Sequence, residues 1–174
     1  KILKKLDLIK KNYFVTTMHR EENVDNIKVF KRLLKSFNLL VKKYDKKLIW
    51  PIHPRSKKML KYINFNIDKR IKIIKPLGFF DFIYLEKNCL LTLTDSGTVQ
   101  EESAIFKIPC LIIRDYTERP ETIKAGGALI VGSNIKKILK SVSLFNYKKT
   151  KIKKIKDYSV LNVSSKIIKI LTNY

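Results

Sequence analysis

The sequence predicts an α/β fold in which a doubly wound parallel sheet is covered by helices. Short apolar segments with strand composition alternate with longer segments in which apolar residues recur at helical spacing. The chain has 174 residues, of which 45% are hydrophobic, so it is long enough to bury one core. We therefore expect a single domain, residues 1–174, in which residues 157–174 form a terminal helix.

Strands are expected where a short apolar run ends at turn residues or at proline. The first run ends before Met18, the second before Pro54 and the third before Pro76. The expected strands are residues 12–17, 47–53, 71–74, 88–93, 109–113 and 128–131.

Helices are expected where apolar residues repeat at intervals of three and four. Residues 27–44 are the clearest case, because Phe30, Leu33, Phe37 and Val41 share one face. The other expected helices are the end of a helix in residues 1–11, residues 55–65, 79–87 and 97–106, a short helix opened by Pro120, and residues 134–142 and 159–171. Residues 18–26 read as a polar loop, and residues 148–156 read as a basic connector.

The composition limits the classes of partner. A net charge of +23 invites a nucleic-acid interpretation, but only six of the 38 basic residues are arginine. The lysines are spread along the chain, whereas residues 78–123 hold eight acidic and four basic residues. Solvated lysine accounts for this pattern better than a specific nucleic-acid surface, and the apolar runs are too short to span a membrane.

The cysteine and histidine content points away from a metal site. Cys89 and Cys110 each lie at the start of an expected strand and read as small core residues in a reducing compartment. Two histidines and two scattered cysteines do not have the spacing of a zinc site. We therefore expect no metal and a cytoplasmic protein.

Chemically versatile residues follow several of the expected strands. His19, His53, Asp95-Ser96 and Arg114 each come just after an apolar run. Ligands of doubly wound sheets bind at the carboxyl ends of the strands, so these residues are expected to converge on one edge.

Two stretches carry most of the polar signal. In residues 93–102, a strand ends in Thr94-Asp95-Ser96-Gly97, where small residues before a helix expose amides that can hold a phosphate. The alternative is that Asp95 or Ser96 only caps the helix and that Glu101 and Glu102 answer the helix dipole. In residues 114–121, charged groups crowd one loop, and Arg114 is suited to grip a phosphate. Arg119 is expected to pair with Glu118 or Glu121 instead.

These stretches resemble the non-hydrolysing UDP-N-acetylglucosamine 2-epimerases. The matching motifs occur in the family's order, and they are residues 15–23 (Val15 to Asn23), 51–54 (Pro51 to Pro54), 94–102 (Thr94 to Glu102), 114–121 (Arg114 to Glu121) and 125–132 (Ala125 to Gly132). The resemblance runs from about Tyr13 to Gly132 and covers the C-terminal half of the family. It implies a Rossmann-like, UDP-binding domain that is one half of a glycosyltransferase-B-like fold.

The resemblance also implies a reaction and a set of roles. UDP-N-acetylglucosamine would be epimerised to UDP-N-acetylmannosamine by elimination and re-addition of UDP, through 2-acetamidoglucal and without NAD or metal. His19 would be catalytic or would contact the diphosphate. The expected UDP-binding residues are Arg20, His53, Phe82, Ser96, Gly97, Thr98, Glu102 and Arg114. Within this set, Phe82 would contact the uracil and Glu102 would accept the ribose hydroxyls, although His53 and Phe82 equally fit structural packing.

Two departures and three rival functions remain open. Thr98 stands in place of a second glycine, and Glu21 stands where many members have arginine. The alternative substrate is therefore a related UDP-N-acetylated sugar, whose epimerases also resemble these motifs. The expected partners are a UDP-sugar, the N-terminal domain of the enzyme and, in some assemblies, a second copy. The rivals are a UDP-binding module without turnover, a glycosyltransferase of the same fold and, more remotely, a nucleic-acid binder. Most candidate bases of the family lie on the N-terminal domain, so this domain alone is expected to be inactive.

Overall fold

The computed structural model describes residues 2–147 and 151–172, and it contains the parallel sheet that the sequence predicts. Six strands are ordered β3-β2-β1-β4-β5-β6, and every neighbouring pair is parallel. Their bounds are β1 Tyr13–Thr17, β2 Lys47–Pro51, β3 Ile71–Ile74, β4 Leu91–Thr94, β5 Cys110–Ile112 and β6 Ala128–Ile130. The fold class is therefore confirmed. The third strand has the expected bounds, and the ends of the others shift by at most three residues.

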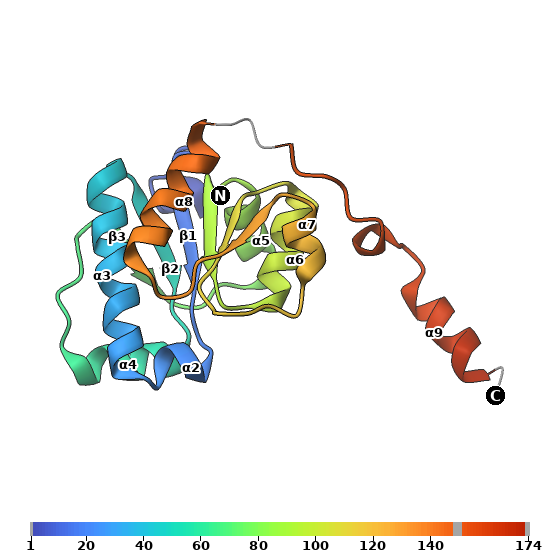
Figure 1. The fold of residues 1–174 in the computed structure, drawn as a ribbon, viewed down its shortest axis with the longest axis horizontal. Helices are drawn as coiled ribbons and strands as arrows, with labels where there is room; N and C mark the ends of the chain where they lie inside the picture. The colour runs from blue at the N-terminus through green and yellow to red at the C-terminus, as the bar shows by residue number, and fades with distance from the viewer. Residues whose placement is uncertain (1, 148–150, 173–174) are drawn as a thin grey trace.

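Helices cover both faces of the sheet, whereas α9 (Val163–Thr172) lies away from it (Figure 1). The α-helices are α1 Ile2–Lys5, α2 Glu21–Val24, α3 Ile27–Tyr44, α4 Pro54–Ile63, α5 Phe79–Lys87, α6 Gly97–Phe106, α7 Pro120–Lys124, α8 Ile135–Tyr147 and α9 Val163–Thr172. In Figure 1, α3 and α8 lie on one side of the strands and α5, α6 and α7 on the other. None of the helices in the described residues is long and apolar enough to cross a membrane.

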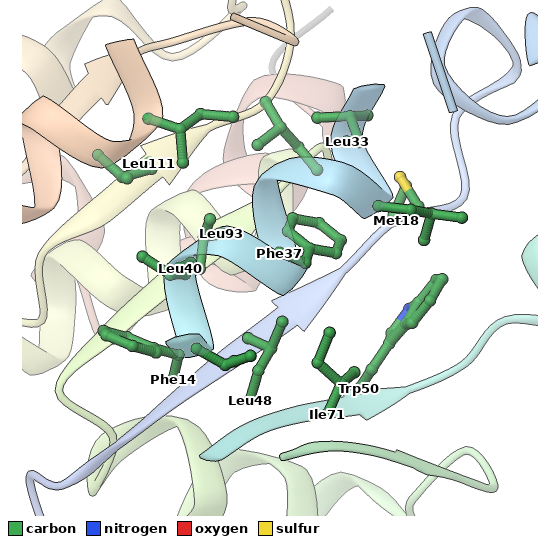
Figure 2. Packing of buried hydrophobic residues seen from close by; sticks show 14 of the residues in the cluster. Phe14, Met18, Leu33, Phe37, Leu40, Leu48, Trp50, Ile71, Leu93 and Leu111 are labelled. Atoms are coloured by element: carbon green, nitrogen blue, oxygen red, sulfur yellow. The ribbon is translucent and has the colours of Figure 1, made fainter. Parts of the chain in front are cut away.

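The long helix α3 shows how local sequence and packing agree. The Asn26 side chain accepts hydrogen bonds from the amides of Lys28 and Val29, which caps the helix. Its apolar stripe, including Leu33 and Phe37, is fully buried against the sheet. Figure 2 shows these side chains packed over β1 and β2, beside Phe14, Leu48 and Trp50. Each such side chain contributes on the order of 2 kcal/mol by burial.

Three expected element boundaries were wrong. The polar loop over residues 18–26 contains α2, because Asn23 is buried and its amide is held by Asp95 and by the Ile113 carbonyl. Helix α8 continues past Val142 to Tyr147, since no residue in between breaks a helix. In the terminal segment, only a 3-10 turn forms over Asp157–Ser159, and α9 begins four residues later than expected. Of the expected basic connector, residues 148–150 lie outside the described residues.

Candidate functional site

Four of the predicted site residues, His19, His53, Phe82 and Ser96, line one cavity near the carboxyl ends of β1 and β4. From β1 the chain builds β2 and β3 on one side, whereas β4 is followed by β5 and β6 on the other. The strand order therefore reverses between β1 and β4, which is where doubly wound sheets leave a crevice for a ligand. Thr17 and Thr94 end the two strands, and their hydroxyl oxygens lie 2.5 Å apart.

Asp95 is the buried anchor of this crevice. Its carboxylate has no exposed surface and accepts hydrogen bonds from the backbone amides of His19 (2.9 Å) and Arg20 (2.9 Å) and from the Asn23 side chain (3.2 Å). Burial by itself would raise the pKa of Asp95, but the hydrogen bonds from His19 and Arg20 together lower it. Asp95 is therefore an ionised group that fixes the loop after β1.

The same carboxylate orients the His19 ring. His19 Nδ1 lies 3.2 Å from Asp95 Oδ1, so Nδ1 is the ring nitrogen that carries the proton in the neutral form. Nε2 is then left to accept or transfer a proton on the other side of the ring. A histidine oriented by a buried carboxylate is the usual arrangement of a general acid or base.

His19 and His53 line a common cavity. The ring centroids are 5.4 Å apart, and the cavity, of about 220 Å³, is also lined by Phe82 and Ser96. His53 caps α4, because its Nδ1 accepts the Arg55 amide at 3.2 Å, so the neutral ring carries its proton on Nε2. The structure thus gives His53 a structural role and a place in the cavity wall at the same time.

The first turn of α6 opens at this crevice. Ser96 is the N-cap residue, but its side chain makes no capping hydrogen bond. The amides that begin a helix have no partner within the helix, and here no capping side chain satisfies them. Together with the positive end of the helix dipole, they form a turn that can hold the oxygens of a phosphate. Gly97 and Thr98 lie in this turn, Thr98 with an exposed side chain.

Two further predicted residues lie near this turn without lining the cavity. Glu102 is half-buried in the second turn of α6. Arg20 is exposed at the start of α2, directly after His19. Within the described residues, no group of three His, Cys, Asp or Glu side chains is arranged to hold a metal ion.

Arg114 is held by partners within the protein. Only 3% of the residue is exposed; its Nε donates to Glu22 at 2.9 Å, and its Nη atoms donate to the Glu118 carboxylate at 3.0 and 3.1 Å. The guanidinium also lies over the Tyr116 ring. The structure does not bring Arg114 to the cavity of His19 and His53. A phosphate contact by Arg114 stays a prediction.

The rest of the loop after β5 fastens helix α6. The Thr117 hydroxyl donates to Gln100 at 2.5 Å, and the Arg119 guanidinium pairs with Glu101. The expected pairing of Arg119 with the Glu118 or Glu121 carboxylate was wrong. Arg119 pairs with Glu101 and donates to the Glu118 backbone carbonyl, whereas the Glu121 carboxylate accepts from the Tyr158 hydroxyl. A charged loop is thus explained in good part by contacts inside the fold.

Two functional features were not predicted from the sequence. The first is the contact of Asp95 with His19: Asp95 was expected at this edge of the sheet, with a helix cap as the alternative, but not as the partner of His19. An acidic residue at the end of one strand and a histidine at the end of another are the signal that could have paired it with His19. The second is Arg119, whose guanidinium lies 3.7 Å from the position of a side-chain carbon on Gly97. A guanidinium therefore lies beside the first turn of α6.

Comparisons with known proteins give matches over nearly the whole chain. The model of the family described as UDP-N-acetylglucosamine 2-epimerase matches residues 1–172. The UDP-N-acetylglucosamine 2-epimerase of Methanocaldococcus jannaschii is 47% identical over 146 residues, which are 82% of this chain and 40% of the relative. The structure of the M. jannaschii UDP-GlcNAc 2-epimerase in complex with UDP-GlcNAc and UDP superposes with a TM-score of 0.84 at 39% identity. That match covers 99% of this chain and 48% of that one.

A relative with a different sugar is also similar. The UDP-2,3-diacetamido-2,3-dideoxy-D-glucuronate 2-epimerase of Pseudomonas aeruginosa is 30% identical over 121 residues, which are 70% of this chain and 33% of the relative. The chain thus spans less than half the length of the relatives that it matches.

Proposed function

The chain belongs to the UDP-N-acetylglucosamine 2-epimerase family, and we propose that it supplies the UDP-binding half of such an enzyme. The observation that carries the proposal is that His19, oriented by Asp95, lies beside the uncapped first turn of α6. A reaction that releases UDP from a sugar needs a group that moves protons and a site that accepts the developing negative charge.

The proposed reaction removes the proton at C2 of UDP-N-acetylglucosamine and breaks the bond between C1 and the UDP oxygen. The products of this step are 2-acetamidoglucal and UDP. The UDP oxygen then bonds again to C1 while C2 receives a proton on the opposite face, which gives UDP-N-acetylmannosamine. In this reaction His19 Nε2 carries a proton on the leaving-group side.

The UDP moiety is expected to lie across the cavity and the start of α6. Phe82 and His53 would contact the uracil end, and the amides of the turn at Ser96, Gly97 and Thr98 would hold the diphosphate. Glu102 would accept the ribose hydroxyls. The sequence also places Arg20 and Arg114 among the expected UDP-binding residues. Arg119, which lies beside Gly97, adds a third guanidinium.

The helix α9 supports the need for a second half of the enzyme. Figure 1 shows α9 at the end of an extended segment, away from the sheet. All of its residues are exposed, including Ile167, Ile170 and Leu171 at 51–71%. A helix of ten residues is marginal in water without packing. We expect its apolar side to pack on the N-terminal half, because this chain covers only 40–48% of the relatives.

The remaining partners and the compartment are further parts of the proposal. Two buried free thiols, Cys89 and Cys110, suit a reducing cytoplasm. A homodimer is expected from the family resemblance and is tested by the mass of the joined halves in solution. The exact sugar stays undecided between UDP-N-acetylglucosamine and a related UDP-N-acetylated sugar.

Proton exchange at C2 tests the proposal directly. The 174-residue chain, alone and with the N-terminal half of a relative, is incubated with UDP-N-acetylglucosamine in deuterated buffer and followed by NMR. We expect deuterium at C2 only with both halves, because the reacting groups must be positioned from two sides. UDP binding to the chain alone is measured by calorimetry in parallel. UDP binding with no exchange in the joined halves would favour a binding module, and the absence of both would refute the site.

A further inference from the structure

A buried carboxyl group lies beneath the proposed ribose site and has no part in the reaction described above. Glu86, on α5, has no exposed surface. Its Oε1 accepts the Ser103 hydroxyl at 2.8 Å, and the Ser103 oxygen lies 3.0 Å from the Thr92 hydroxyl. Its Oε2 is buried with no donor among the described residues. An ionised carboxylate with an unfilled acceptor is costly to bury, so this group needs a further explanation.

The explanation is the second carboxyl group beside it. Ser103 follows Glu102 in α6, which packs against α5. The Glu86 and Glu102 carboxyl groups are close enough to affect each other's pKa, and burial raises the pKa of both. Two carboxyl groups can hydrogen-bond only if one of them carries the proton. Burial is the main cause that raises the pKa of Glu86 to about 9. The hydrogen bond from Ser103 lowers this pKa, and the neighbouring Glu102 raises it further. Glu86 is fully buried whereas Glu102 is half-buried, so Glu86 keeps the proton and donates, and Glu102 is the carboxylate that accepts.

The surroundings keep Glu86 protonated at neutral pH. Cys89 follows α5 and Cys110 lies on β5, and burial raises the pKa of both thiols, so both are neutral. The buried residues that α1 contributes are apolar. The charge of the Lys11 ammonium opposes the rise in the pKa of Cys89, and the ammonium donates a hydrogen bond to the Lys87 carbonyl. In the part of the chain that the structure describes, Glu86 forms no ion pair that would favour its charged form.

We propose that Glu86 is a positioning residue for nucleotide binding: as a carboxylic acid it donates a hydrogen bond to Glu102 and fixes the Glu102 carboxylate where it accepts the ribose hydroxyls. The inference rests on the proposed function, which places the ribose at Glu102. A free carboxylate on an exposed helix samples several rotamers, whereas a carboxylate held from below is preorganised for its ligand. The pair thereby contributes to the preference for ribose over deoxyribose.

The test compares two nucleotides that differ only in the hydroxyl that Glu102 would accept. The chain is titrated by calorimetry with UDP and with 2′-deoxy-UDP at pH 7, as the wild type and as the Glu86→Leu and Glu86→Gln variants. We expect the wild type to prefer UDP by about tenfold, the value of one charge-assisted hydrogen bond. Glu86→Leu should bring this ratio close to one. Glu86→Gln should retain it, because the amide still donates to Glu102 and still accepts from Ser103.

The ratio separates positioning from a general loss of structure. Damage to the fold lowers the affinity for both nucleotides alike and leaves their ratio unchanged. If Glu86→Leu does not fold, the ratio is followed in the wild type and in Glu86→Gln as pH rises through 9. The wild-type ratio should then fall, because two ionised carboxylates repel each other, while that of Glu86→Gln stays constant. Ionisation of the uracil ring affects both nucleotides equally and cancels.

The outcomes that contradict the inference are distinct from those that contradict the function. A ratio that is lost in Glu102→Gln but kept in Glu86→Leu overturns the role of Glu86 alone. The role of Glu86 is also overturned if the ratio of UDP affinity to 2′-deoxy-UDP affinity falls with pH equally in Glu86→Gln and in the wild type. If the wild type does not bind UDP, or if Glu102→Gln leaves the ratio unchanged, the placement of the ribose is wrong and the positioning role falls with it.

Discussion

The chain has two charge-rich stretches, residues 93–102 and residues 114–121. In the folded protein their polar groups have different surroundings. In the first, the helix α6 begins without a side-chain cap, beside the cavity that His19 lines. In the second, Arg114 is held between Glu22 and Glu118, and Arg119 by Glu101. A high density of charged residues therefore does not by itself mark a ligand site. The proposed ligand site is indicated instead by the first backbone amides of α6, which no capping side chain accepts.

The largest expected effect comes from removing the anchor that joins the two sides of the crevice. Asp95→Ala leaves the amides of His19 and Arg20 and the Asn23 side chain without their buried acceptor. We expect the free energy of unfolding to fall by about 3 kcal/mol, measured by denaturant titration at pH 7.

Acid unfolding provides the control for Asp95. Its folded pKa lies below the ordinary value of 3.8, so its stabilisation is present above that value and is lost as pH falls through the lower folded pKa. The isosteric Asp95→Asn variant should lose less stability with acid below about pH 4 than the wild type. Equal slopes would show that the carboxylate is not ionised in the native protein.

Removing the buried guanidinium tests the second stretch. Arg114→Ala leaves two carboxylates, Glu22 and Glu118, without the cation between them. We expect a loss of about 2 kcal/mol in the free energy of unfolding, since both carboxylates are partly exposed and recover solvation. Titration of the same variant with UDP decides the open prediction: a tenfold weaker affinity would support a phosphate contact, and an unchanged affinity would limit Arg114 to holding the loop.

A single methyl group tests the first stretch. A side-chain carbon on Gly97 would meet Arg119 at 3.7 Å, which is ordinary contact, so Gly97→Ala should fold as the wild type does. A phosphate that approaches the backbone of this turn would meet the same methyl group. We expect UDP to bind about tenfold more weakly, which corresponds to about 1.4 kcal/mol. Uridine, which has no phosphate, is the matched control, and an equal loss for both ligands would refute the position of the diphosphate.

The smallest expected effect lies at the far end of the second stretch. The Tyr158 hydroxyl donates to Glu121, which joins the segment before α9 to α7. Tyr158→Phe removes one partly exposed hydrogen bond, and we expect a loss of about 0.5–1 kcal/mol in the free energy of unfolding. A loss above 2 kcal/mol would mean that this contact fixes the position of the terminal segment.

The sequence by itself determined the sheet, most of its helices and the edge at which the site lies. The spacing of apolar residues and the position of turn residues act over a few neighbours. Local sequence therefore determines strands such as Tyr13–Thr17 and helices such as Ile27–Tyr44. Placing His19, His53 and Ser96 after strands was then enough to bring them to one cavity.

Only the tertiary structure decided which polar groups are bound inside the protein and which stay available. Arg114 pairs with Glu22 across 92 positions of sequence, and Asp95 meets His19 across 76. Local patterns carry no information about such partners, because they depend on how distant elements pack. The same holds for Glu86 and Glu102, which become an acid and a carboxylate only because α5 buries one of them against α6. A pKa and a free donor are properties of the surroundings that the fold creates, whereas a helix or a strand is largely a property of the segment that forms it.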